Sequence, residues 1–166
     1  MKKVKIKYFS DDYPRLKKLP QGDFIDLRVD NLVDMQNVSE GELEVIRIGF
    51  SEDGILQYKK GDVLLLGLGV AMELPTNHEA YLVPRSSTFK NTGFLLTNGV
   101  GIVDEIYAGN QDQWMAMVYC TRDGAINRYD RLFQFRIQEK MPKIEFQEVE
   151  YLDNDDRGGF GSTGIE

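Results

Sequence analysis

Four residues that follow the apolar run AYLV have side chains suited to binding an oxyanion: Pro84, Arg85, Ser86 and Ser87. A guanidinium, two hydroxyls and the free N–H groups at the start of a helical turn form a compact set of donors for a phosphate. The open alternative is a helix cap beside a surface arginine, which is the commoner meaning of such a stretch by itself. A phosphate-binding role therefore needs support from elsewhere in the chain.

A second stretch, NGVGIVDEIY, runs from residue 98 to residue 107 and is expected to form an apolar hairpin. The main-chain N–H and C=O groups of such a hairpin suit the polar edge of a flat base, and Asn98 adds a side-chain amide. Asp104 lies among apolar residues, where a carboxylate can accept a proton from water. The alternative is that Asp104 ends a turn and Tyr107 is an ordinary core residue. The candidate substrate contacts here are Asn98, Gly99, Ile102, Val103 and Tyr107.

Gln134 is a polar amide in an otherwise apolar run, two positions after Leu132 and therefore on the same face of a strand as that apolar residue. An amide in such a position needs a hydrogen-bonding partner, which is either another protein group or a ligand. We therefore treat Gln134 as a candidate phosphate contact. The nearby Asp130 and Arg131 are interpreted as a structural ion pair.

The C-terminal segment is rich in glycine, with four glycines between residues 158 and 164. Glycines let the main chain wrap closely around phosphate oxygens, hydroxyls and an arginine supply donors, and a phenylalanine can stack on a base. The candidate contacts are Arg157, Phe160, Gly161, Ser162 and Thr163. The alternative is a disordered terminus, and in the isolated subunit we expect residues 152–166 to form a mobile arm.

The composition limits the fold and the kinds of partner. The chain has 166 residues, 42% of them apolar, and a net charge of −7. We expect one domain over residues 1–166, with no polymeric nucleic-acid partner and no membrane partner. No apolar run approaches the roughly 18 residues of a membrane helix. No signal peptide is recognised and Cys120, a single cysteine, can form no internal disulfide, so we expect a cytoplasmic protein with Cys120 buried in the core.

The residues above must be positioned by strands, because apolar residues mostly recur at every second position in short runs. The expected strands contain Val4 to Tyr8, Leu43 to Ile48, Val63 to Leu65, Met115 to Tyr119, Leu132 to Ile137 and Ile144 to Val149. Frequent turn signals between them indicate an all-β jelly roll, sandwich or distorted barrel. The only expected helix is one short turn after Pro84, with a serine cap. Trp114 is expected in the core, and His78 on the surface.

These four motifs, together with Asp26 in the stretch DFIDLR at residues 23–28, resemble, in order, the five motifs of the homotrimeric dUTPase family, from about residue 23 to residue 164. The resemblance implies an all-β fold and hydrolysis of dUTP to dUMP and diphosphate. It implies that Asp104 is the general base that activates water against the α-phosphorus. Asn98 and the hairpin main chain would read uracil, and Tyr107 would pack under deoxyribose. Arg85, Ser86, Ser87 and Gln134 would hold the phosphates.

The resemblance also implies a cofactor and an assembly. Mg²⁺ would be held mainly by the substrate phosphates, with Asp26 acting through water. Phe160 would cover the base, while Arg157, Ser162 and Thr163 would close on the γ-phosphate. Each active site would be shared by the three subunits of a homotrimer.

Two features depart from the family pattern. Only two residues separate Arg157 from Phe160, where the family usually has two more, so the reach of Arg157 to the γ-phosphate is an open question. An insertion over residues 35–59 is expected to add a β-hairpin around Asp53-Gly54. It is either a lengthened surface hairpin or a surface that binds a protein partner.

Two other activities are compatible with this type of fold. One is a dUTP-binding regulatory protein without catalysis. The other is an enzyme similar to dCTP deaminase, which the NGVGIVDEIY pattern and the FGSTG tail disfavour. The resemblance favours the dUTP diphosphatase over both.

Overall fold

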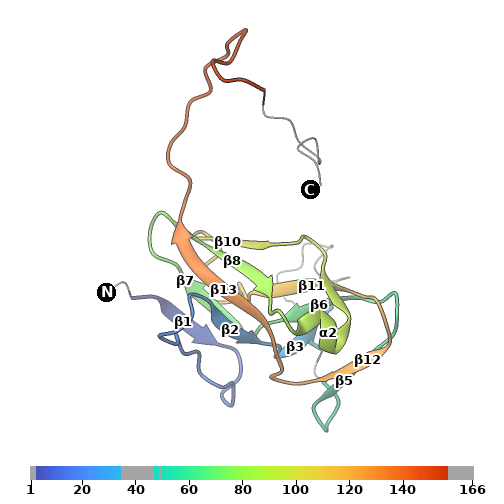
Figure 1. Ribbon diagram of the computed structural model, residues 1–166. Coiled ribbons are helices and arrows are strands. Elements are labelled where there is room, and N and C mark those ends of the chain that lie inside the picture. The colour runs from blue at the N-terminus through green and yellow to red at the C-terminus, as the bar shows by residue number, and fades with distance from the viewer. Residues whose placement is uncertain (1–2, 35–46, 49, 157–166) are drawn as a thin grey trace.

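Strands make up nearly all the regular structure of this computed structural model, which describes residues 3–34, 47–48 and 50–156 (Figure 1). One sheet has the strand order β10 (Gly101–Asp104), β8 (His78–Pro84), β13 (Arg131–Glu139) and β2 (Ile25–Arg28). A second has the order β4 (Arg47–Ile48), β3 (Asn31–Val33), β6 (Val63–Gly67), β11 (Met115–Cys120) and β9 (Phe94–Leu96). Two strand pairs complete the set: β1 (Lys5–Tyr8) with β7 (Val70–Glu73), and β12 (Gly124–Asn127) with β5 (Ile55–Tyr58).

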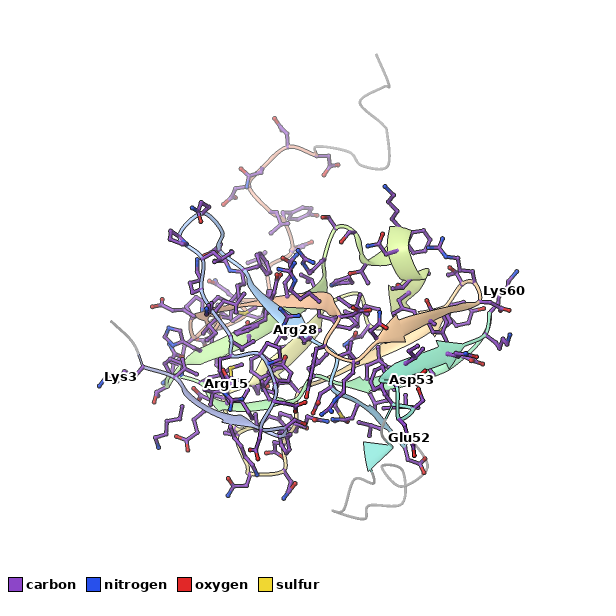
Figure 2. All side chains as sticks on the ribbon, turned by 90° about the horizontal axis from the view of Figure 1, so that it is seen from below. Lys3, Arg15, Arg28, Glu52, Asp53 and Lys60 are labelled. Atoms are coloured by element: carbon purple, nitrogen blue, oxygen red, sulfur yellow. The ribbon has the colours of Figure 1, made fainter. Side chains whose placement is uncertain are left out.

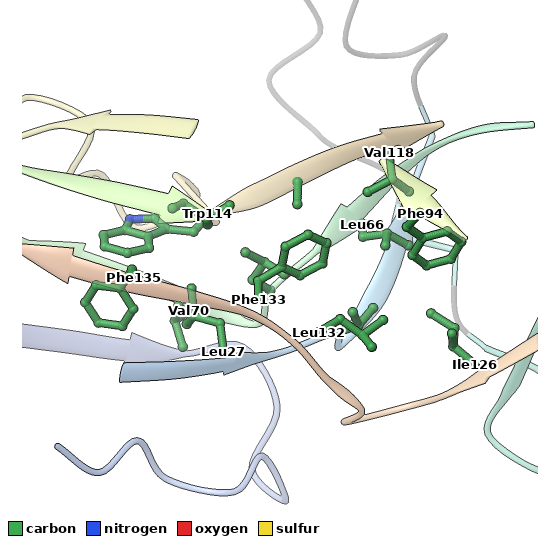
Figure 3. Close-up of a cluster of buried hydrophobic side chains, with 14 of the residues drawn as sticks. Leu27, Leu66, Val70, Phe94, Trp114, Val118, Ile126, Leu132, Phe133 and Phe135 are labelled. Atoms are coloured by element: carbon green, nitrogen blue, oxygen red, sulfur yellow. The ribbon is translucent and has the colours of Figure 1, made fainter. Parts of the chain in front are cut away.

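All these pairings are antiparallel, and the all-β prediction is confirmed. The core lies where the inward faces of the sheets meet (Figure 3), because alternate residues of strands such as β8 and β11 are buried. Trp114 is fully buried there, and its ring meets that of Phe135 edge-on with centroids 5.0 Å apart. Cys120 is also fully buried, as expected, and burial raises the pKa of its thiol to about 11.

The expected helical turn after Pro84 is confirmed as α2 (Thr88–Thr92). It ends at Gly93, which has a φ of 77°, a conformation that glycine adopts without steric cost. Ser87 occupies the N-cap position, but its side chain makes no capping hydrogen bond, so that detail of the prediction was wrong. No helix in the described ranges is long and apolar enough to cross a membrane.

The strand expected at Ile144 to Val149 is absent from the described chain. After β13 the chain leaves the body as an extended segment (Figure 1), and no described strand lies beside it to complete a ladder. Its apolar side chains remain in solvent: Phe146 is 91% exposed. An alternating apolar pattern predicts a strand only if a partner edge is available.

The hairpin expected around Asp53-Gly54 lies partly outside the described residues; within them, β4 pairs with β3 and β5 pairs with β12. One further expectation was wrong. His78 is not a surface residue: it is 9% exposed, begins β8 opposite Glu139 of β13, and its Nδ1 lies 2.9 Å from the carbonyl oxygen of Thr76. Most of the proposed insertion at 35–59 lies outside the described residues, so its role as a partner surface stays a prediction.

Candidate active site

Arg85, Arg131 and Gln134 gather around Asp26 at one end of the four-stranded sheet, and we call these four residues the arginine cluster. Arg85 Nε lies 2.9 Å from one carboxylate oxygen of Asp26, and Arg131 Nη1 lies 3.2 Å from the other. Gln134 is the direct cross-strand partner of Asp26, and its amide donates to the Pro84 carbonyl at 3.3 Å. Two guanidiniums and an amide around one carboxylate leave an excess of positive charge and donors, which suits phosphate oxygens.

The cluster depends on β13, which lies between β2 and β8. Gln134 faces Asp26 on β2 and Val83 on β8, so the residues that follow β8 are brought against β13. The Arg85 backbone N–H then donates to the Leu132 carbonyl at 3.0 Å. Ser86 is exposed and Ser87 half-buried in the turn before α2, next to Arg85. The structure thus brings the predicted Arg85, Ser86 and Ser87 to the same place as Gln134 and Asp26.

Arg131 was missed as a site residue, and the predicted ion pair between Asp130 and Arg131 was wrong. Asp130 instead accepts a hydrogen bond from the Asn127 backbone N–H at 2.9 Å, while Arg131 reaches Asp26. The main chain turns at Tyr129, which has a φ of 70°, and the next two residues, Asp130 and Arg131, therefore contact different neighbours. The residue types carried no signal of this contact, because an arginine next to an aspartate does not determine which way either side chain faces.

The turn that presents Arg131 is fixed by a buried carboxylate. Asp30 is 3% exposed and accepts hydrogen bonds from the Ser10 hydroxyl, from the Asn31 amide and from Arg128, whose Nη2 lies at 2.8 Å. Arg128 also lies over the ring of Tyr129, with its guanidinium carbon 4.5 Å from the centroid. A buried carboxylate with charged and neutral partners resists displacement, so this network holds the turn in place.

A second group of predicted residues lines a pocket of about 550 Å³: Ile102, Val103, Asp104 and Tyr107, together with Ile106, Trp114 and Met115. Its volume lies within the range of small-molecule sites, and its walls are mostly apolar apart from Asp104. Tyr107 is fixed by its hydroxyl, which donates to the Gln113 carbonyl at 3.0 Å. The sequence did not single out Ile106 and Met115, because nothing in an apolar residue's type distinguishes a pocket wall from core.

The stretch from residue 98 to residue 107 does not form the expected hairpin. Its single strand, β10, pairs with β8, and the preceding β9 pairs with β11 in the other sheet. Asn98 and Gly99 lie on the exposed turn between β9 and β10, where Gly99 has a φ of 69°. This turn crosses between two sheets, so local sequence could not reveal its strand pairing.

Asp104 ends β10 with its side chain 55% exposed, and Lys140 Nζ lies 2.8 Å from its Oδ1. The same ammonium lies 3.4 Å from Glu105, and the hydrogen bond to Asp104 raises the pKa of Lys140. The Asn77 backbone N–H in turn lowers the pKa of the Glu105 carboxyl. Lys140 gave no sequence signal, since only the registers of β10, β8 and β13 bring it beside Asp104.

Asp104 and the arginine cluster lie far apart within one chain. Asp104 pairs with Glu79 on β8, whereas Asp26 on β2 aligns through Gln134 with Val83. Asp26 and Asp104 are separated by three strand spacings of about 4.8 Å across the sheet and by four residue rises of about 3.3 Å along the strands, so they lie roughly 20 Å apart. At this separation Asp104 and the arginine cluster cannot contact the same phosphate group within one chain.

The remaining predicted contacts are Arg157, Phe160, Gly161, Ser162 and Thr163, which lie outside the described residues. Within the described ranges no group of three or more histidine, cysteine, aspartate or glutamate residues could hold a metal ion. Asp26 is already engaged by two arginines. The described residues therefore form no dedicated cation site, and a cation here would have to take most of its ligands from a bound phosphate and water.

The family model described as dUTPase matches residues 50–164. The chain is 44% identical over 163 residues to the SPbeta prophage-derived deoxyuridine 5'-triphosphate nucleotidohydrolase YosS of Bacillus subtilis, covering 98% of this chain and 99% of that protein. The dUTPase of Staphylococcus bacteriophage 80alpha, solved as a mutant with dUpNHpp, superimposes with a TM-score of 0.68 at 13% identity, covering 99% of this chain and all of the other.

A mutant dUTPase from phage phi11 of S. aureus, whose structure shows the coordination of a structural Mg(II) ion, superimposes with a TM-score of 0.63 at 12% identity. That match covers 92% of this chain and 100% of the other. These two structures are similar in fold, whereas the family model and the prophage relative are similar in sequence. The chain belongs to the dUTPase family and is a dUTP nucleotidohydrolase of the bacterial and phage type.

Proposed function

We propose that this dUTPase cleaves dUTP between the α- and β-phosphorus atoms, with Asp104 as the general base, in an active site shared between subunits. The observation that carries this proposal is the pocket in which Asp104 adjoins Ile102, Val103 and Tyr107. It combines apolar walls for a nucleoside with one carboxylate at the place where a proton must be removed.

In this mechanism Asp104 accepts a proton from water as the water oxygen forms a bond to the α-phosphorus. The bond from the α-phosphorus to the bridging oxygen breaks, and that oxygen leaves with its electron pair as part of diphosphate. Arg85, Arg131, Gln134 and the hydroxyls of Ser86 and Ser87 stabilise the phosphate oxygens. Mg²⁺ bound to these oxygens would neutralise further charge, with Asp26 contacting it through water.

We assign the selectivity for uracil and for deoxyribose to β10, to the turn that precedes it and to Tyr107 that follows it. Asn98 and the main chain from Gly99 to Val103 would pair with the polar edge of uracil, because exposed N–H and C=O groups can match its donor and acceptor order. The ring of Tyr107 would pack under deoxyribose and leave no room for a 2′-hydroxyl. Its hydrogen bond to the Gln113 carbonyl supports this role by fixing the ring.

The separation of roughly 20 Å between Asp104 and the arginine cluster supports a homotrimer. In a ring of three subunits, the cluster of one subunit would face Asp104 of its neighbour. The C-terminal arm would then supply Phe160 to cover the base and Arg157, Gly161, Ser162 and Thr163 to close on the phosphates. The extended course of residues 140–156 away from the body is compatible with an arm that reaches a neighbour (Figure 1).

Turnover of four nucleotides tests the proposal. With Mg²⁺ present, we expect diphosphate release from dUTP and not from dCTP, dTTP or UTP. Asp104→Asn should lower kcat about 10²- to 10⁴-fold while nucleotide binding is retained. Asp53→Asn, at an exposed turn, is the matched control and should leave kcat unchanged. Binding of dUTP without turnover in the parent chain would indicate a regulatory protein, and deamination of dCTP would indicate a deaminase.

A further inference from the structure

A small basic pocket adjoins the arginine cluster on the side of the N-terminal segment. It has a volume of about 180 Å³, and its charged lining consists of Arg15, Lys17, Arg28, Arg131 and Asp26. Four cations thus surround one carboxylate in a chain whose net charge is −7. Asp26 adds little repulsion toward an anion, because its two oxygens are bound by Arg85 and Arg131.

The cations are held in place but keep donors available. Arg28 Nη1 donates to the Tyr129 carbonyl at 2.7 Å. Arg15 donates to the Tyr13 carbonyl at 3.0 Å, and its guanidinium carbon lies 4.3 Å from the centroid of the Tyr8 ring. A guanidinium has five N–H donors, so these contacts orient Arg15 and Arg28 without using all of them.

Lys17 adds a further cation to this pocket. Its side chain is exposed, and in the described part of the chain no carboxylate forms an ion pair with it. Arg15 and Arg28 are both labelled in Figure 2, where they lie on the same side of the molecule. Pre-oriented guanidiniums beside a free ammonium form a site for a multiply charged oxyanion.

The size and position of the pocket restrict the ligand. Its volume is below the roughly 300 Å³ at which sites for drug-sized molecules begin, so it fits a small anion better than a nucleotide. It shares Asp26 and Arg131 with the arginine cluster, so an anion that leaves the cluster needs to move only past Asp26 to enter it. Hydrolysis of dUTP releases one small anion of high charge, which is diphosphate.

We propose that this pocket, lined by Arg15, Lys17, Arg28 and Arg131, is a binding site for the diphosphate product. The inference rests on dUTP hydrolysis as the reaction that supplies this anion. The pocket receives diphosphate after the bond to the α-phosphorus has broken, while dUMP remains beside Asp104. Bound diphosphate then slows rebinding of dUTP, because its charge lies next to the residues that must hold the substrate phosphates.

The test compares two double variants that remove the same charge. Arg15→Gln/Lys17→Gln alters the pocket, whereas Lys3→Gln/Lys60→Gln alters two exposed lysines near opposite ends of the molecule (Figure 2). Calorimetric titration with inorganic diphosphate, without nucleotide, measures binding whether or not the protein turns over. We expect the Kd to rise about tenfold or more in the pocket variant, because two charge-assisted hydrogen bonds are lost, and less than twofold in the control.

Steady-state kinetics separates the pocket from the substrate site. In the pocket variant the inhibition constant for diphosphate should rise about as much as the Kd, while that for dUMP changes less than twofold. Inorganic phosphate should bind the parent more weakly than diphosphate does. An unchanged Kd for diphosphate would overturn the proposal, as would equal effects of both double variants. Diphosphate binding that weakens in the pocket variant, with no dUTP turnover by the parent chain, would count against the dUTPase mechanism and leave the pocket assignment standing. Loss of turnover in the pocket variant alone would place Arg15 and Lys17 in the substrate site and overturn the proposal.

Discussion

Mixing two inactive variants should restore activity if the active site is shared between subunits. Asp104→Asn removes the proposed base, and Arg85→Gln removes a proposed phosphate ligand about 20 Å away along the sheet. Each variant alone should retain about 1% of parent turnover or less, since a general base contributes roughly 10²- to 10⁴-fold and an oxyanion donor a similar factor. A mixed trimer contains interfaces where the intact Asp104 of one subunit faces the intact Arg85 of the next.

The expected recovery follows from the symmetry of a cyclic trimer. In a random equimolar mixture, the subunit that supplies Asp104 to a given site has an intact base with a probability of about one half. The neighbouring subunit has an intact arginine cluster with the same probability. About a quarter of the sites, and thus about a quarter of parent turnover, should return. The assay is diphosphate release from dUTP after the two variants are unfolded together and refolded.

A matched control uses the parent chain mixed with the double variant Asp104→Asn/Arg85→Gln. Its activity should be about half that of the parent before subunits exchange and about a quarter after exchange. If each subunit held a complete site, the first mixture would stay inactive and the second would remain near one half. Either result would refute the shared site and the distance argument on which it rests.

Three further outcomes follow from individual contacts. Lys140→Gln should lower kcat more than it raises KM, because the ammonium 2.8 Å from Asp104 orients the base. Lys140→Arg should restore much of the lost kcat, measured as diphosphate release from dUTP. Asp30→Ala should lower the free energy of unfolding in urea by about 2–4 kcal/mol, since it breaks a buried network with Arg128. Burial raises the pKa of Tyr13 from 10.0 to about 12. The stability that Tyr13 contributes should therefore be complete below pH 10 and lost as the pH approaches 12. Urea melts at a series of pH values measure this loss, and the Tyr13→Phe variant should lack the part that Tyr13 contributes.

The residue types alone located much of the chemistry. Arg85, Asp104 and Gln134 were identified because a guanidinium, a carboxylate and an amide beside apolar runs need partners, and because their order resembles one family. Period-two alternation also identified β13, the strand that carries Gln134, since side chains on a strand alternate between core and solvent. These are local properties of the chain, and local sequence is sufficient to specify them.

Only the tertiary structure decided which strands pair, and pairing decides which side chains meet. Arg131 reaches Asp26 rather than Asp130, and Lys140 reaches Asp104, because β2, β13, β8 and β10 lie side by side in one register. The apolar pattern after β13 predicted a strand at Ile144 to Val149, yet no described edge pairs with it. A backbone hydrogen bond between strands needs two segments distant in sequence, so a pattern within one segment cannot determine its partner.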